Sequence, residues 1–152
     1  MLIEGKFTLK APRPAVWDFL IEPGVLTSCI PGAEKLEAID DRTWEGIVIQ
    51  KVGPITVKLN FTQTLTEIDP PRHIKAVGRG ADVTKAGTFS QETVVDLTEG
   101  APGETEVAYT SNVNMVGRLA TFGERIMRAK VKSVGEQFTR NLQDKLQSRT
   151  SG

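Results

Sequence analysis

Residues 118–146 read RLATFGERIMRAKVKSVGEQFTRNLQDKL, and this stretch without proline decides the fold. Its apolar residues recur at helical spacing in two adjoining stripes, Leu119, Phe122 and Ile126 in one and Met127, Val131, Val134, Phe138 and Leu142 in the other. The opposite side of such a helix carries Arg118, Arg125, Arg128, Lys132 and Gln143. A helix of this length would extend about 43 Å at 1.5 Å per residue, so it needs an equally long surface to pack against.

The residues before this stretch alternate between apolar and polar side chains, as half-buried strands do. In the clearest case, Ile, Val, Leu and Phe alternate with Thr, Lys, Asn and Thr over residues 55–62, and the strand is broken at Asp69-Pro70-Pro71. Short helices are expected over residues 14–20, where Pro14 suits a first turn, and 25–29. Strands are expected over residues 1–9, 34–39, 43–52, 55–68, 73–80, 88–97 and 105–116.

This order of elements predicts an α+β fold. Seven strands joined by short turns form an antiparallel meander, with two short helices after the first strand. Such a strongly twisted sheet curls around the long C-terminal helix and leaves a space between them. We expect one domain over residues 1–147, followed by a short tail over residues 148–152.

Composition excludes several classes of protein and site. Nineteen basic residues balance 19 acidic ones, so net charge gives no reason to expect a nucleic-acid partner. A single cysteine, Cys29, excludes an internal disulfide, and a single histidine, His73, excludes any site that needs two imidazoles. The N-terminus lacks the layout of a signal peptide and no apolar run reaches the ~20 residues of a membrane span, so a cytoplasmic protein is expected.

The balanced total hides an uneven distribution of charge. Residues 118–149 contain eight basic and three acidic side chains, a net charge of +5, so the rest of the chain carries −5. Two interpretations stay open at this stage. The basic side chains form either a solvated helix face or a surface that meets an anionic membrane or partner, and its members would be Arg118, Arg125, Arg128 and Lys132.

No constellation of catalytic or metal-binding residues stands out in the sequence. His73 has no nucleophile elbow to serve, and no cluster of His, Cys and Asp has the spacing of metal ligands. The neighbours of Cys29 in the sequence offer no cation to lower its pKa, so we expect a small buried apolar side chain there.

The space between sheet and helix is therefore the candidate site. The residues expected to line it are mainly aromatic and aliphatic: Trp17, Leu20, Ile30, Leu59, Phe61, Phe89, Tyr109, Leu119, Phe122, Ile126 and Met127. Tyr109, with Gln63, Gln91 and Ser111, would supply hydrogen-bonding groups. A mostly apolar wall with a few polar groups suits a hydrophobic small molecule.

Several segments, in this order along nearly the whole chain, carry a family resemblance: Gly5-Lys6-Phe7, Pro14, residues 16–20 (VWDFL), residues 29–34 (CIPGAE), residues 51–55 (KVGPI), Asp69-Pro70-Pro71 and residues 117–120 (GRLA). In these the sequence resembles the helix-grip, START-like superfamily of the polyketide cyclase and Bet v 1 type. Within it, the sequence is most similar to the CoxG family, the G-subunit family of carbon monoxide dehydrogenase. Longer members of that family continue into a linker and a hydrophobic membrane anchor, whereas the printed sequence ends at Gly152, so we do not expect it to insert into a bilayer by itself.

The resemblance implies a non-catalytic protein that holds an isoprenoid quinone (menaquinone or ubiquinone) or another lipid, with no covalently bound cofactor. It also implies that the protein recruits a carbon monoxide dehydrogenase-type molybdenum hydroxylase, whose subunits would be its partners, to the inner face of the cell membrane. The alternative is a cyclase, dehydratase or hydrolase of the polyketide cyclase type, with Tyr109 or His73 as general acid or base. A third interpretation is an assembly factor with a filled core and no ligand.

Overall fold

The computed structural model describes residues 2–22, 25–52, 55–83, 87–117 and 124–151. These residues form seven strands and three helices, in the order β1 (Leu2–Leu9), α1 (Arg13–Ile21), α2 (Val25–Ser28), β2 (Ala33–Ala38), β3 (Thr43–Val52), β4 (Ile55–Asp69), β5 (His73–Asp82), β6 (Gly87–Glu99), β7 (Thr105–Gly117) and α3 (Glu124–Ser151). The strands make one antiparallel sheet in the order β1-β7-β6-β5-β4-β3-β2. The predicted helix-grip architecture is confirmed.

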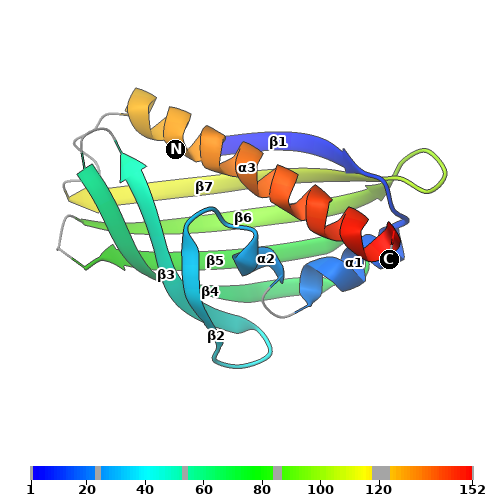
Figure 1. Ribbon diagram of the computed structural model, residues 1–152, viewed down its shortest axis with the longest axis horizontal. Coiled ribbons are helices and arrows are strands. Elements are labelled where there is room, and N and C mark those ends of the chain that lie inside the picture. The colour runs from blue at the N-terminus through cyan, green and yellow to red at the C-terminus, as the bar shows by residue number, and fades with distance from the viewer. Residues whose placement is uncertain (1, 23–24, 53–54, 84–86, 118–123, 152) are drawn as a thin grey trace.

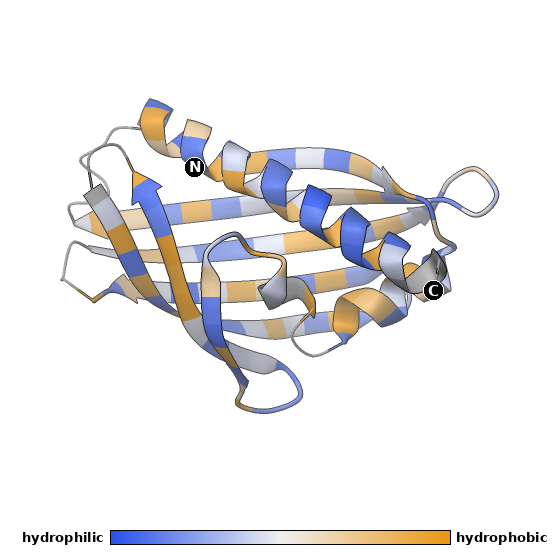
Figure 2. Cartoon of the chain, in the orientation of Figure 1, coloured by the Kyte–Doolittle hydropathy of each residue, from blue (hydrophilic) through white to orange (hydrophobic). Residues whose placement is uncertain are grey.

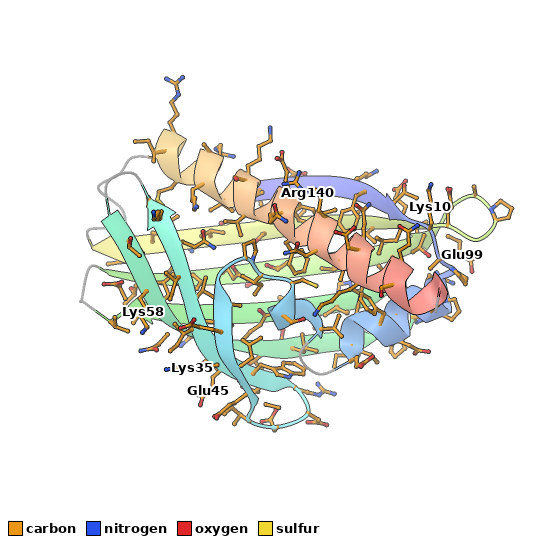
Figure 3. The ribbon with its side chains drawn as sticks, viewed as in Figure 1. Lys10, Lys35, Glu45, Lys58, Glu99 and Arg140 are labelled. Atoms are coloured by element: carbon orange, nitrogen blue, oxygen red, sulfur yellow. The ribbon has the colours of Figure 1, made fainter. Side chains whose placement is uncertain are left out.

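The sheet curls around α3, which crosses it diagonally; α1 lies at one end, and α2 lies beside it, nearer the middle (Figure 1). We call the side of the sheet that faces α3 its concave face. Side chains of β1 alternate between exposed and less exposed, and Leu9 is buried. Charged side chains such as Lys35, Glu45 and Arg140 are exposed on the outside of the molecule (Figure 3). The alternation that predicted the strands is thus the alternation between the concave face and solvent.

Helix α1 closes one end of the concave face. It begins beside two prolines, which suit a first turn because the N–H that proline lacks would have no partner there. The Val16 N–H donates to the Pro12 carbonyl at 3.0 Å, and the buried residues of α1 are Val16, Trp17, Phe19 and Leu20. They pack with Leu9, Leu142 and Leu146 into the main hydrophobic core. We call this region the packed end.

Helix α3 lies along β1 and is fastened to it by side chains. The Arg128 guanidinium donates to the Leu2 carbonyl at 2.9 Å, and the Gln143 amide donates to the Thr8 carbonyl at 3.3 Å. Polar residues gather on the outward side of the helix (Figure 2). The helix continues to Ser151, five residues beyond its expected end at Leu146.

A second, smaller cluster lies near the start of the described part of α3. Met127 packs there with Val52 and Val57, and Leu59 and Met115 contact them. Ile126, the neighbour of Met127, is 52% exposed, although the sequence predicted that it faces the sheet. Successive helical residues point about 100° apart, so turning Met127 toward the sheet turns Ile126 away from it.

Candidate functional site

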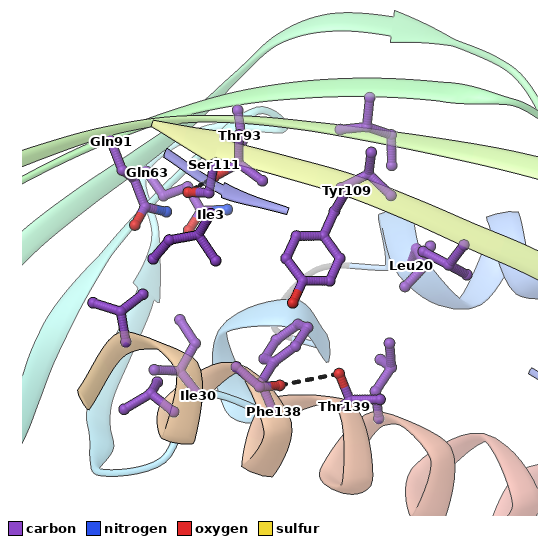
Figure 4. A pocket seen from close by; sticks show the side chains of 18 of the residues that line it. Ile3, Leu20, Ile30, Gln63, Gln91, Thr93, Tyr109, Ser111, Phe138 and Thr139 are labelled. Atoms are coloured by element: carbon purple, nitrogen blue, oxygen red, sulfur yellow. Dashed lines mark hydrogen bonds between the residues drawn. The ribbon is translucent and has the colours of Figure 1, made fainter. Parts of the chain in front are cut away.

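A cavity of about 260 Å³ lies between the concave face and the middle of α3 (Figure 4). The sheet contributes Ile3, Phe7, Gln63, Leu65, Ile74, Ala76, Gln91, Thr93, Val95, Val107, Tyr109 and Ser111. The other side is formed by Leu20, Ile30, Val131, Val134, Gly135, Phe138, Thr139 and Leu142. Every strand from β4 to β7, together with β1, therefore reaches the cavity.

The cavity wall is apolar toward the packed end. Leu20 comes from α1, and Leu142 and Phe138 come from the half of α3 that continues into the core. Leu142 is 1% exposed and belongs to both the cavity wall and the main core, so the cavity directly adjoins the core at this residue.

Tyr109 projects from β7 across the cavity toward α3 (Figure 4). Its ring lies over Gly5, the residue paired with it on β1, since a Cβ built on Gly5 would come within 2.7 Å of the phenol carbons. Phe7 lies beside it with ring centroids 6.3 Å apart and planes tilted by 57°. A glycine in the first strand thus makes room for the single tyrosine of the chain.

Polar side chains gather on the concave face beside Tyr109. The hydroxyls of Thr93 and Ser111 lie 2.9 Å apart and bond to each other. Gln63 and Gln91 lie near them and face the cavity (Figure 4). Within the described part of the chain, their side-chain amides and the Tyr109 hydroxyl have no hydrogen-bond partner, so these groups are available to a ligand.

Apart from the Tyr109 phenol, the wall contains no ionisable side chain among the described residues that form it. Among all the residues that the structure describes, no group of three or more His, Cys, Asp or Glu side chains could hold a metal ion. None of the helices described is both long and apolar enough to cross a membrane.

Six of the residues predicted from the sequence do lie on the cavity wall. They are Leu20, Ile30 and Tyr109 from the predicted lining, and Gln63, Gln91 and Ser111 from the predicted polar groups. The predicted lining residues Leu119 and Phe122, and Arg118 of the basic face, lie outside the described residues.

The structure differs from the prediction at six other positions, because local packing occupies five of those side chains and α3 turns the sixth, Ile126, toward solvent. Trp17 is part of the main core, Leu59 and Met127 form the smaller cluster, and Ile126 is exposed. Phe61 on β4 is buried, and it pairs with Gly46 on β3. Phe89 covers Gly80, where a Cβ would come within 2.1 Å of the ring. Apart from Ile126, these side chains fill space on the concave face away from the cavity.

Several wall residues were missed although the sequence contained their signal. Ile3 and Phe7 belong to the alternation of the first strand, and Val131, Val134 and Phe138 belong to the apolar stripe of the helix. Their pattern predicted that they face inward. It did not predict that they border an open space.

His73 lies outside the cavity wall, at the start of β5. Its Nδ1 is 2.7 Å from Asp96 Oδ1, and its Nε2 is 3.7 Å from Glu67 Oε1. The enzyme alternative needed His73 or Tyr109 inside the cavity beside a carboxylate. Tyr109 is inside, but neither Asp nor Glu is among the described residues that form the wall.

Cys29 is buried in the main core, as predicted. Burial raises the pKa of its thiol, while the charge of Lys145 and a hydrogen bond from Ser28 act in the opposite direction. The sequence neighbours of Cys29 offered no cation, but α3 brings Lys145 to it across the fold, where the ammonium also donates to the Ser28 hydroxyl.

Comparison with known proteins agrees with this architecture. The model of the carbon monoxide dehydrogenase G-subunit (CoxG) family matches residues 5–147. The chain belongs to the CoxG family. A comparison with curated protein sequences gives no match. The residues matched by the CoxG family include every described residue of the cavity wall except Ile3.

Solved structures similar to this CoxG domain include a conserved protein from Geobacillus kaustophilus, which is 26% identical over 97% of this chain and 96% of its own, with a TM-score of 0.89. A START superfamily protein from Mycobacterium smegmatis is 9% identical over 97% of both chains, with a TM-score of 0.73. The Zhui aromatase/cyclase from Streptomyces sp. R1128 is 16% identical over 99% of this chain and 95% of its own, with a TM-score of 0.68. The last two share the fold of the CoxG domain.

Proposed function

We propose that this CoxG-family protein is a non-catalytic binding protein that holds an isoprenoid quinone, such as menaquinone or ubiquinone, or a similar lipid. The observation that carries the proposal is the cavity beneath α3, whose wall combines apolar side chains with a few neutral polar groups. Membership of the CoxG family supports a role beside a carbon monoxide dehydrogenase-type molybdenum hydroxylase, which the protein would bring to the inner membrane.

The size of the cavity limits how such a ligand is held. At about 260 Å³ it lies just below the roughly 300–1,000 Å³ of ordinary small-molecule sites. This volume suits a ring system with the first part of a chain, so the rest of a long isoprenoid chain would extend beyond the cavity.

The character of the wall favours binding over acid–base catalysis. A general acid or base must lie within hydrogen-bond reach of the proton that it transfers. Of the two candidates, Tyr109 is on the wall, but none of Asp, Glu or His is among the described wall residues beside it, and His73 is engaged with Asp96 elsewhere. Neutral side chains that bind a ligand without reacting with it are what a carrier needs.

The proposal is tested by extracting the protein, purified from a quinone-producing host, and analysing the extract by mass spectrometry. A matched pair of tryptophan variants sharpens the test, because Val134 faces the cavity and its neighbour Ser133 is exposed. We expect quinone with the wild type and Ser133→Trp, and little with Val134→Trp, whose indole would fill the cavity. Wild-type protein that is free of quinone and also fails to bind added quinone would contradict the proposal.

Membrane contact through α3 is a second part of the proposal. Arg125, Arg128 and Lys132 are exposed on the half of α3 away from the packed end. Each cation near an anionic surface contributes about 1 kcal/mol, and salt screens the attraction. Three such contacts, about 3 kcal/mol together, allow transient docking but not stable anchoring, which takes a second signal.

Vesicle co-sedimentation tests this contact. We expect binding to anionic vesicles at low salt that is lost at high salt and in Arg125→Glu/Lys132→Glu. Arg128 stays unchanged because it also bonds to β1. The control Lys10→Glu/Arg42→Glu makes the same change of charge at exposed loop positions outside α3 and should bind like the wild type. Binding that does not depend on lipid charge and is unchanged in both variants would mean that the basic face of α3 is only a solvated helix surface.

A further inference from the structure

We propose that Gln63 and Gln91 form a subsite for the polar ring of the ligand, and that this subsite selects a neutral ring bearing carbonyl or hydroxyl groups in either oxidation state. The inference rests on the proposed function, since it names the part of the cavity that recognises the head of the molecule. It is carried by the arrangement of three residues on neighbouring strands, which we call the amide row: Gln63, Gly78 and Gln91.

The amide row runs straight across the sheet. Gln63 on β4 pairs with Gly78 on β5, and Gly78 pairs with Gln91 on β6. Gly78 therefore separates the two glutamines without a side chain of its own. The Gln91 side chain lies over it, because a Cβ built on Gly78 would be 3.1 Å from Gln91 Cγ and 3.5 Å from its Nε2. Glycine at this position leaves no side chain between the two glutamines, whose amides both face the cavity (Figure 4).

The amides of this row lack partners within the described part of the chain. Their polar neighbours Thr93 and Ser111 share one hydrogen bond with each other. The rest of the wall nearby is apolar, and polar groups that face such surroundings need a partner from water or a ligand. A bound ring whose oxygens reach the amide row would supply those partners.

The chemistry of the row determines which head group fits. An amide carries both an acceptor oxygen and two donor hydrogens, and rotation of its plane exchanges them. A quinone carbonyl can therefore accept from the amide nitrogen, and a hydroquinone hydroxyl can donate to the amide oxygen. A carboxylate or phosphate would instead bury its charge where the described wall offers neither Lys nor Arg. Fatty acids and phospholipids are thus disfavoured, and both oxidation states of a quinone are accepted.

The wall also orients the ligand. The amide row lies away from the packed end, Leu20 and Leu142 lie toward it, and Tyr109 lies between the row and Leu20 (Figure 4). With the ring on the amide row, the first isoprene units can contact Phe138 on α3.

Binding measurements with two probes test the inference. The first is 2-methyl-1,4-naphthoquinone carrying two isoprene units, in its oxidised and its reduced form, and the second is the naphthalene with the same chain and no oxygens. In Gln63→Leu/Gln91→Leu we expect both forms of the quinone to bind about tenfold or more weaker, which corresponds to the loss of one or two hydrogen bonds. The naphthalene should bind this double variant at least as tightly as it binds the wild type.

Controls separate recognition from folding. Thr62→Leu/Ser90→Leu makes the same kind of change on the same strands, at positions that neighbour the glutamines and point to the opposite face, and should bind quinone normally. Each single glutamine variant is measured as well, with thermal unfolding to show that it is folded. In the wild type we expect the dissociation constants of the oxidised and reduced quinone to lie within about threefold of each other, because the amide offers both a donor NH2 and an acceptor oxygen.

The outcomes distinguish this inference from the proposed function. Wild-type protein that binds neither form of the quinone contradicts both. Quinone binding that is unchanged in the folded double variant overturns the amide row and leaves the proposed function standing. Palmitate that binds the wild type more tightly than the quinone overturns the selection for a neutral head group.

Discussion

The concave face beneath α3 has a packed end and an open middle, built from the same kinds of apolar residue. At the packed end, α1 inserts Val16, Trp17 and Leu20 between α3 and the sheet, and Leu146 is buried. Beneath the middle of α3, no described element takes that place. Val131, Val134 and Phe138 remain half-buried around a cavity of about 260 Å³.

This difference shows that an amphipathic stripe and a filled core are separate properties. The stripe of α3 runs through both regions, so it determines which side of the helix turns to the sheet. At the packed end that side is filled with the help of α1, which reaches only one end, and near the start of α3 Met127 fills it directly on the strands. A helix laid on a curved sheet therefore leaves a cavity where neither kind of packing is made.

The comparison is tested most directly by the same substitution in both regions, Val16→Ala and Val131→Ala. Both residues are helical, so the change in helix propensity is the same. Val16 is 0% exposed. Its truncation should lower the free energy of unfolding by about 2–3 kcal/mol, because buried apolar surface is lost and a cavity is left in the core. Val131 already borders an open space, so its truncation should cost less than about 1 kcal/mol.

Urea unfolding followed by fluorescence measures both free energies. Equal losses in the two variants would mean that the middle of α3 is packed as tightly as the end. The comparison between the two regions would then be wrong.

The sequence predicted the elements well because their signals are local. Alternation in residues 55–62 identifies β4, prolines mark the start of α1, and the stripe of residues 127–142 identifies the inner side of α3. It predicted six residues of the wall by inward parity together with residue type. It could not separate Phe61, Phe89 and Trp17 from the wall, because partners distant in the chain fix their places, such as Gly80 beneath Phe89. Cavity boundaries depend on which inward side chains find a neighbour.

A second prediction concerns Phe138, the largest α3 side chain on the cavity wall. Phe→Ala in a filled core costs about 3–5 kcal/mol, whereas Phe138 is half-buried, packs against the core and also borders the cavity. We therefore expect Phe138→Ala to lower the free energy of unfolding by about 1–2 kcal/mol. It should also weaken quinone binding about tenfold, because the aromatic contact with the ligand is lost.

Urea unfolding and quinone titration on the same samples test this prediction. The exposed variant Arg140→Ala on the same helix is the control for loss of a long side chain. A stability loss of the size expected in a filled core would show that the cavity does not extend beneath Phe138.

The smallest expected effect is at Gly135, which lies in α3 directly opposite Tyr109. Glycine within a helix is less stable than alanine by about 0.5–1 kcal/mol, because its backbone loses more conformational freedom on folding. A Cβ at this position would stand 3.7 Å from the Tyr109 hydroxyl, an ordinary van der Waals distance, so alanine fits without displacing the ring. Gly135→Ala should therefore raise the free energy of unfolding by about 0.5–1 kcal/mol.

If the glycine keeps room for a ligand, the same methyl group should weaken quinone binding, by about threefold, while it stabilises the protein. Ser133→Ala, at an exposed position two residues away, should gain a few tenths of a kcal/mol, about the difference in helix propensity, and leave binding unchanged. Urea unfolding and quinone titration of both variants give the comparison. If Gly135→Ala loses stability, Tyr109 is packed against the helix too closely to leave space for a ligand there, and the open middle of the concave face would have to lie farther from α3.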